Sequence, residues 1–235
     1  MKKRWIAWGL VAVTAVLLGV YWVYQQYFAM DARTRKVVEF LRVPGSNQAL
    51  SSPALSVCGD APFMMPTTGM IGFIWHDSFY PGHHHQGIDI FGGGGVEQTE
   101  VYAAYDGFLT RLADWKSSVI IRIPSDPLVP ERQIWTYYTH MADPDGRSLI
   151  SDAFPPGTSE VFVSAGTFLG YQGNYSGKSG RPTGVHLHFS IVKDNGKGQF
   201  LNEVENENTL DPSPYFGLQL NADTNPDDIP ICQQP

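Results

Sequence analysis

The stretch GVHLHFSIV, residues 184–192, alternates apolar and polar side chains from Val185 to Ile191. Successive side chains of a β-strand point to opposite faces of the sheet. The apolar set from Val185 to Ile191 would therefore lie on one face, and His186, His188 and Ser190 would lie on the other. This pattern predicts a half-buried strand with a core-facing side and a polar side that carries two imidazoles.

Four further stretches consist of short apolar runs bounded by glycine, proline or aspartate, at 101–112, 117–124, 133–141 and 160–171. Runs rich in β-branched and aromatic residues are typical of β-strands. No long amphipathic helix interrupts them, which favours antiparallel pairing over helical crossovers. We expect a mainly β protein, an antiparallel sheet or sandwich, with its folded domain at 61–218.

The bulk composition is that of a globular domain. The chain has 235 residues, 43% of them hydrophobic and 17% charged, enough for one substantial core or at most two small ones. A formal net charge of -7 argues against a nucleic-acid partner. Cys58 and Cys232 bracket the domain and could form a disulfide in an oxidising compartment or remain two buried thiols. The tail at 219–235 lacks periodicity and is expected to be loose apart from Cys232.

The N-terminal segment, 1–28, differs from the rest. Basic residues at positions 2–4 precede a run without a charged side chain from Trp5 to Phe28. As a helix, its first twenty residues would span roughly 30 Å, the thickness of a bilayer's hydrocarbon. We expect an uncleaved single-pass membrane anchor, with the N-terminus inside and the remaining chain exported. A cleaved signal peptide is the alternative, although its apolar region is usually shorter.

Residues 29–60 connect this segment to the domain. A short helix is predicted, with Asp31 as its cap and Val37, Phe40 and Leu41 on one face, ending at the Pro-Gly pair that follows. The polar sequence from 46 to 56 then reads as a linker.

Two other strands carry polar groups on one face. In HQGID, His85 and Asp89 share a side, with a glycine leaving open space between them. In QIWTYYTHM, His140 would share its side with Thr136 and Tyr138, so Tyr138 could add a hydroxyl to a groove there.

Zinc binds imidazole nitrogen and carboxylate oxygen, and a catalytic site commonly has three protein ligands and a water. His85, Asp89 and His188 would supply that set. His140 and His186 would then remain unligated and able to move protons near neutral pH. Two histidines and a carboxylate also form the facial triad of iron(II) oxygenases, which is an alternative from another enzyme class.

These motifs resemble the lysostaphin-type zinc metallopeptidases, which cut peptide bonds in bacterial cell-wall peptidoglycan. The resemblance covers about Pro62 to Leu218. The three central motifs are HQGID at 85–89, YYTHM at 137–141 and GVHLHFSI at 184–191. Flanking matches are AAYDGFL at 103–109, AGTFLGYQGNYSG at 165–177, SGRPTGVHLHF at 179–189 and LDPSPYFGL at 210–218.

The resemblance implies an antiparallel sheet crossed by a groove with the metal on its floor. It implies His85, Asp89 and His188 as zinc ligands and His140 and His186 as the catalytic pair. The first two histidines of the HHH triplet would then be loop residues at the mouth of the groove. The expected protein is a peptidoglycan endopeptidase held at a bacterial cell membrane, with its domain outside the cytoplasm.

The sequence also departs from the family pattern. Val185 stands where the family often has proline, and Ser190 stands where it often has glutamate. The segment at 142–163 is longer than usual, and the glycine turn at 173–177 has one extra residue; both could change the groove walls. A non-enzymatic role is the main alternative, because some relatives of this fold serve as partners that activate other wall hydrolases.

Overall fold

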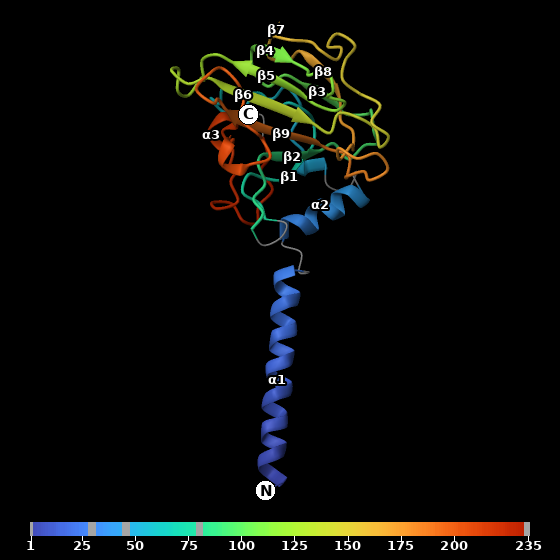
Figure 1. The fold of residues 1–235 in the computed structure, drawn as a ribbon, viewed down its shortest axis with the longest axis vertical. Helices are drawn as coiled ribbons and strands as arrows, with labels where there is room; N and C mark the ends of the chain where they lie inside the picture. The colour runs from blue at the N-terminus through green and yellow to red at the C-terminus, as the bar shows by residue number, and fades with distance from the viewer. Residues whose placement is uncertain (1, 28–31, 44–47, 79–81, 233–235) are drawn as a thin grey trace.

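The computed structural model describes residues 2–27, 32–43, 48–78 and 82–232. Helices are short apart from the first, and the body of the protein is β-structure (Figure 1). The helical elements are α1 (Lys2–Tyr27), α2 (Ala32–Arg42), η2 (Gln48–Leu50), η3 (Asn206–Asn208) and α3 (Ser213–Phe216). The strands are β1 (Met70–Phe73), β2 (Ile88–Phe91), β3 (Glu100–Tyr102), β4 (Gly107–Thr110), β5 (Val119–Ile123), β6 (Ile134–Thr139), β7 (Val161–Val163), β8 (Phe168–Tyr171), β9 (Leu187–Lys193) and β10 (Thr209–Leu210).

The main sheet is antiparallel and has the order β1-β2-β9-β6-β5-β4-β7, with β10 added beside β9. A second, two-stranded sheet is formed by β3 and β8. β9, the strand of the opening motif, lies between β2 and β6, so it brings together the segments that carry the other two motifs. The predicted mainly β, antiparallel fold is confirmed.

One face of the main sheet covers the core. Leu187, Phe189 and Ile191 of β9 are fully buried, as are Ile88 and Ile90 of β2. Each strand therefore alternates between a core face and a second face, as the sequence predicts. On the second face, β9 places His188 beside Asp89 of β2.

Two of the predicted strands are each two strands in the structure. The run at 101–112 divides into β3 and β4, and the run at 160–171 divides into β7 and β8. The first breaks at the bend 104–106, just before Gly107 begins β4, and the second breaks at Gly166, whose φ of +80° belongs to the left-handed region. Turn chemistry inside an apolar run therefore decided the strand ends.

α2 packs on β1 at the edge of the main sheet (Figure 1). Val37 and Phe40 are buried against Met70, Phe91 and Ile229. Gly72 permits the close approach, since a Cβ there would lie 2.6 Å from Cγ2 of Val37. The proposed cap, Asp31, and the Pro-Gly pair lie outside the described residues.

Arg33 fastens α2 to the domain. It is buried, its Nη1 lies 2.6 Å from Oδ2 of Asp77, and its Nη2 donates to the carbonyl of Asn225. Burial raises the pKa of Asp77, although its hydrogen bond from the Ile74 amide and the charge of Arg33 oppose this shift. An arginine of α2 is thus part of the folded domain.

α1 stands apart from the sheet (Figure 1), and the side chains described along it are exposed. Met1 and Phe28 of the predicted anchor lie outside the described residues. In the part of the chain that the structure describes, no helix meets the length and apolarity needed to cross a membrane. The membrane anchor stays a prediction.

The described parts of the predicted linker and of the tail predicted to be loose, 48–56 and 219–232, are both packed on the domain; 46–47 and 233–235 lie outside the described residues. Ser52 exchanges backbone hydrogen bonds with Gly69 at 2.8 and 3.0 Å, and its hydroxyl accepts from the amide of Cys232. Cys58 and Cys232 form a disulfide across 174 residues of sequence. These segments lack periodicity because irregular backbone, rather than a helix or strand, makes their contacts.

Candidate metal centre

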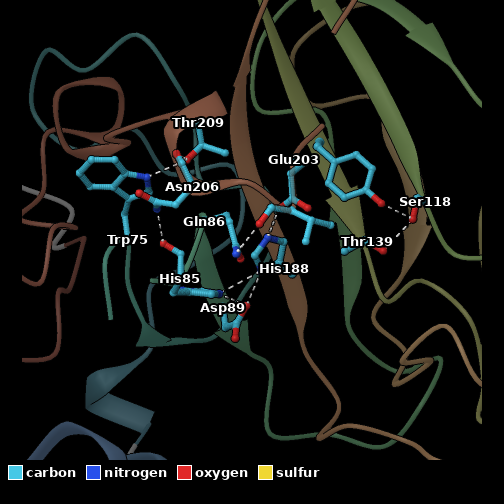
Figure 2. A network of polar contacts seen from close by, with 12 residues as sticks. Trp75, His85, Gln86, Asp89, Ser118, Thr139, His188, Glu203, Asn206 and Thr209 are labelled. Atoms are coloured by element: carbon cyan, nitrogen blue, oxygen red, sulfur yellow. Dashed lines mark hydrogen bonds and ion pairs between the residues drawn. The ribbon is translucent and has the colours of Figure 1, made fainter. Parts of the chain in front are cut away.

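Three side chains converge on the second face of the main sheet (Figure 2). Asp89 and His188 are direct partners across β2 and β9, and His85 precedes β2. Nδ1 of His188 lies 2.8 Å from Oδ1 of Asp89 and 3.1 Å from Nε2 of His85. Nε2 of His85 lies 3.2 Å from the same carboxylate oxygen. All three residues are buried.

The outer ring nitrogens of the two histidines already have acceptors. Nδ1 of His85 lies 3.1 Å from the carbonyl oxygen of Ile74, and Nε2 of His188 lies 2.7 Å from Oε1 of Glu203. A neutral ring has one proton, and in each ring that proton is held on the outer nitrogen. The inner nitrogens and the Asp89 oxygen are then three acceptors facing one another, an arrangement that requires a positive charge among them.

Electrostatics agree with this requirement. Burial alone would raise the pKa of Asp89, but the charges of His85 and His186 and hydrogen bonds from His188 and His85 hold it well below its usual range. Burial alone would lower the pKa of His188, but the neighbouring carboxylates of Glu203 and Asp89 raise it to about 10. The carboxylates on both sides of His188 thus favour a proton or a metal cation at this point.

The trio fits zinc by donor chemistry and by spacing. Imidazole nitrogen and carboxylate oxygen are both ordinary zinc ligands. Bonds of about 2.0–2.1 Å in a tetrahedral site place neighbouring ligand atoms roughly 3.3 Å apart. The three separations of 2.8, 3.1 and 3.2 Å are close to that value. The site can therefore close around a small cation with little movement.

The other two histidines of the motifs lie beside the trio. The rings of His140 and His186 are 4.5 Å apart, and Nε2 of His186 lies 3.6 Å from Oδ1 of Asp89. Nδ1 of His140 lies 2.7 Å from the carbonyl oxygen of Tyr175, and Nδ1 of His186 lies 2.7 Å from that of Gly184. Each ring thus holds its proton on Nδ1 and presents Nε2 as an acceptor.

Both rings are neutral at physiological pH. Burial, together with the nearby charges of His186 and His188, lowers the pKa of His140 to about 4. Burial also lowers the pKa of His186, against the opposing effect of Asp89. Phe91 stacks on the ring of His186, with centroids 5.0 Å apart, and keeps one face of that ring from water. Such neutral imidazoles can accept a proton from a nearby group.

The prediction that His140 and Tyr138 lie on the same side of the strand was wrong. Thr139 and Tyr137, which pair with His188 and Ser190, share the site's face, whereas Tyr138 is fully buried in the core. The hydroxyl of Tyr138 accepts from the Ala104 amide and does not reach the groove. His140 follows the end of β6 with φ +69°, and this left-handed residue reverses the alternation and brings its ring to the site.

A groove of about 590 Å³ contains the five side chains. One wall is apolar and comes from α2, through Val37, Val38 and Leu41. Thr139, Thr183 and Gln86 add polar groups to the lining. Among the described residues that line this groove, none comes from the lengthened segment at 142–163. The effect of this segment on the groove walls stays a prediction, while α2 supplies an apolar wall that the sequence did not indicate.

Sequence reasoning missed Glu203, which lines the groove, and Arg33, which fastens the helix that forms one of its walls. Glu203 lies in a loop without a periodic pattern, and only the small Ser190 beside His188 indicated that a carboxylate was lacking on β9. Arg33 resembled any charged residue of a helix, and its burial depends on Asp77. Of the triplet, His84 is exposed and His83 is half-buried, away from the convergent trio.

Comparison with known proteins gives structural matches alone. No family model and no curated protein sequence matches the chain. Helicobacter pylori Csd3 matches with 18% identity and a TM-score of 0.38, over 71% of this chain and 34% of Csd3. Lysostaphin matches with 20% identity and a TM-score of 0.39, over 63% of this chain and 49% of lysostaphin.

A third match is the catalytic domain of the prophage-encoded M23 protein EnpA from Enterococcus faecalis. Its identity is 22% and its TM-score 0.37, over 64% of this chain and 96% of that domain. This chain thus spans half or less of the solved Csd3 and lysostaphin chains and nearly all of the EnpA domain. One of these matches is lysostaphin, after which the family that the sequence motifs resemble is named.

Proposed function

We propose that this protein is a zinc endopeptidase that hydrolyses peptide bonds of bacterial cell-wall peptidoglycan. One observation carries the proposal: His85, Asp89 and His188 aim three acceptor atoms at one point, within 3.2 Å of one another, and two neutral histidines adjoin them. Two acceptors beside a three-ligand zinc site are the groups that hydrolysis of an amide requires. The sequence motifs add support for the peptidoglycan substrate.

Metal binding and proton transfer would be carried out by different residues of the site. His85, Asp89 and His188 would hold the zinc ion, which supplies a Lewis acid and lowers the pKa of a bound water. Nε2 of His140 or of His186 would accept a proton from the attacking water and return a proton to the leaving amine. Phe91 covers one face of the His186 ring and leaves its Nε2 free to meet the water. The apolar wall from α2 would contact the aliphatic part of a stem peptide.

The test uses the purified full chain loaded with zinc and incubated with purified peptidoglycan. Release of new free amino groups that stops with a zinc chelator and returns with added zinc would support the proposal. No release from folded, zinc-loaded protein would favour a latent or partner-activating wall protein. Metal analysis of the protein as purified, before zinc is added, that finds iron in place of zinc would instead favour the oxygenase alternative.

We also propose that the chain is tethered to a bacterial membrane with its β domain outside the cytoplasm. Support comes from the uncharged run between Trp5 and Phe28 and from the Cys58–Cys232 disulfide, which suits an oxidising compartment. The full chain should stay in the membrane pellet after alkaline carbonate extraction, whereas a chain lacking 2–27 should not. Release of the full chain by carbonate would contradict the tether.

A further inference from the structure

Glu203 makes the one carboxylate contact to an outer ring nitrogen among the four histidines of the described site. Its Oε1 lies 2.7 Å from Nε2 of His188 (Figure 2). The corresponding nitrogens of His85, His140 and His186 lie against backbone carbonyls instead. A carboxylate binds an imidazole N–H more strongly than a neutral carbonyl does and makes the opposite nitrogen a better electron donor.

The loop that carries Glu203 is fixed to the segment that carries His85. It leaves β9 and returns through η3 to β10, and Glu203 is 15 residues beyond His188 in sequence. Nε2 of Gln86 donates to the carbonyl of Val204 at 2.9 Å, and Nδ2 of Asn206 donates to the carbonyl of His85 at 3.1 Å. The loop therefore contacts two of the three convergent residues: the side chain of His188 and the backbone carbonyl of His85 (Figure 2).

Ser190 explains why the carboxylate comes from this loop. It is two residues beyond His188 on the same face of β9, and it is fully buried. A side chain at this position could itself reach the ring of His188, but serine is too short to place a carboxylate there. Glu203 therefore brings from the loop a charge that β9 does not supply.

We propose that Glu203 is the positioning residue of the metal centre: it holds the proton of His188 on Nε2 and so directs Nδ1 toward the ion. This inference rests on the proposed metal site, but not on which substrate is cut. Carboxylates that act in this way on a metal-bound histidine typically contribute about 10–100-fold to metal affinity. Glu203 contacts neither the ion nor the substrate in this role.

The experiment measures zinc affinity of the full chain by competition with a chelator, and cobalt absorption as a second readout. Glu203→Gln keeps an acceptor but removes the charge, so we expect zinc binding roughly 10-fold weaker; Glu203→Ala removes both, for which we expect roughly 100-fold. Glu207→Gln is the matched control, since Glu207 is exposed on the same loop. It should leave the affinity and the cobalt spectrum unchanged.

Two further variants distinguish a wrong role for Glu203 from a wrong metal site. Ser190→Glu added to Glu203→Ala supplies a carboxylate from β9, and it should restore part of the lost affinity. This rescue also distinguishes a positioning role from a merely structural one. Wild-type zinc affinity in Glu203→Ala, with zinc lost in His188→Ala, would overturn the role of Glu203 alone. Wild-type affinity in His188→Ala as well would overturn the metal site itself.

Discussion

Asp89 and His188 are directly opposite one another on the adjacent antiparallel strands β2 and β9, and their Oδ1 and Nδ1 atoms are 2.8 Å apart. Opposite residues on one face of such a pair have Cβ atoms about 4.5–5.5 Å apart, close enough to share an ion. A register shift by one residue would turn one of them into the core. The burial of Ile88, Ile90, Leu187 and Phe189 therefore fixes the geometry of the site.

The first prediction separates His188, the proposed zinc ligand on β9, from His186, the proposed catalytic residue beside it. His188→Ala should lose both zinc and peptidoglycan cleavage, because it removes an acceptor of the convergent trio. His186→Ala should keep zinc and lower kcat by about 10²–10⁴, the usual contribution of a general acid or base. Zinc content by elemental analysis and release of amino groups are measured on the same samples.

His84→Ala is the control for this comparison, since His84 is exposed and belongs to the triplet in the loop. It should keep both zinc and activity. If His186→Ala cleaves peptidoglycan at the wild-type rate, the role given to His186 is wrong even though the metal site stands.

A second prediction concerns acid pH. The pKa of His140 is lowered to about 4, so this ring stays neutral, and able to accept a proton, well below the ordinary histidine value near 6.5. As pH falls, its function is lost only as pH passes through about 4. We expect kcat/KM, corrected for bound zinc, to hold its neutral value at pH 5.5. A fall with an apparent pKa near 6.5 in zinc-replete enzyme would contradict this assignment.

The sequence predicted much of this site because its information is local. Two-residue alternation places His186 and His188 together, and the burial of the intervening Leu187 fixes the face. His85 and Asp89 follow the same rule. What alternation could not predict is a break in it: the left-handed backbone of His140 depends on the turn after β6, so Tyr138 was assigned to the wrong side.

Contacts between segments far apart in sequence were beyond such reasoning. Glu203 reaches His188 only because a loop folds back over β9, and Arg33 is buried only because Asp77 meets it. The division of the predicted strands at the bend 104–106 and at Gly166 shows the same limit. The apolar composition continues across these two turns, whereas the strand pairing stops at them.

A third prediction tests the attachment of α2. Arg33→Ala removes a buried ion pair with Asp77 and a hydrogen bond to the carbonyl of Asn225. Breaking a buried pair commonly costs about 3–5 kcal/mol. Because burial already raises the pKa of Asp77, that carboxyl can take up a proton and reduce the cost, so we expect a loss near 2 kcal/mol. The free energy of unfolding in urea measures it.

Arg35→Ala is the matched control, an exposed arginine on the same helix. It should change the free energy of unfolding by no more than about 0.5 kcal/mol. Since Val37, Val38 and Leu41 wall the groove, Arg33→Ala should also raise KM for peptidoglycan more than it lowers kcat. Equal effects of the two arginine changes would show that α2 is not held by Arg33.

The final prediction links the disulfide to the same wall. The tail closed by Cys232 carries Asn225, which accepts from Arg33, and Ile229, which packs with Val37 and Phe40. Cys58→Ser with Cys232→Ser opens a loop of 174 residues, and a cross-link of such length commonly contributes roughly 2–5 kcal/mol to stability. We expect hydrogen exchange to rise first in the tail and in α2, because their contacts depend on one another.

The strands β2 and β9, and with them the zinc content, should be unaffected while the protein stays folded. Faster exchange in β9 with an unchanged α2 would disprove the link, since it would mean that the disulfide supports the sheet and not the wall of the groove.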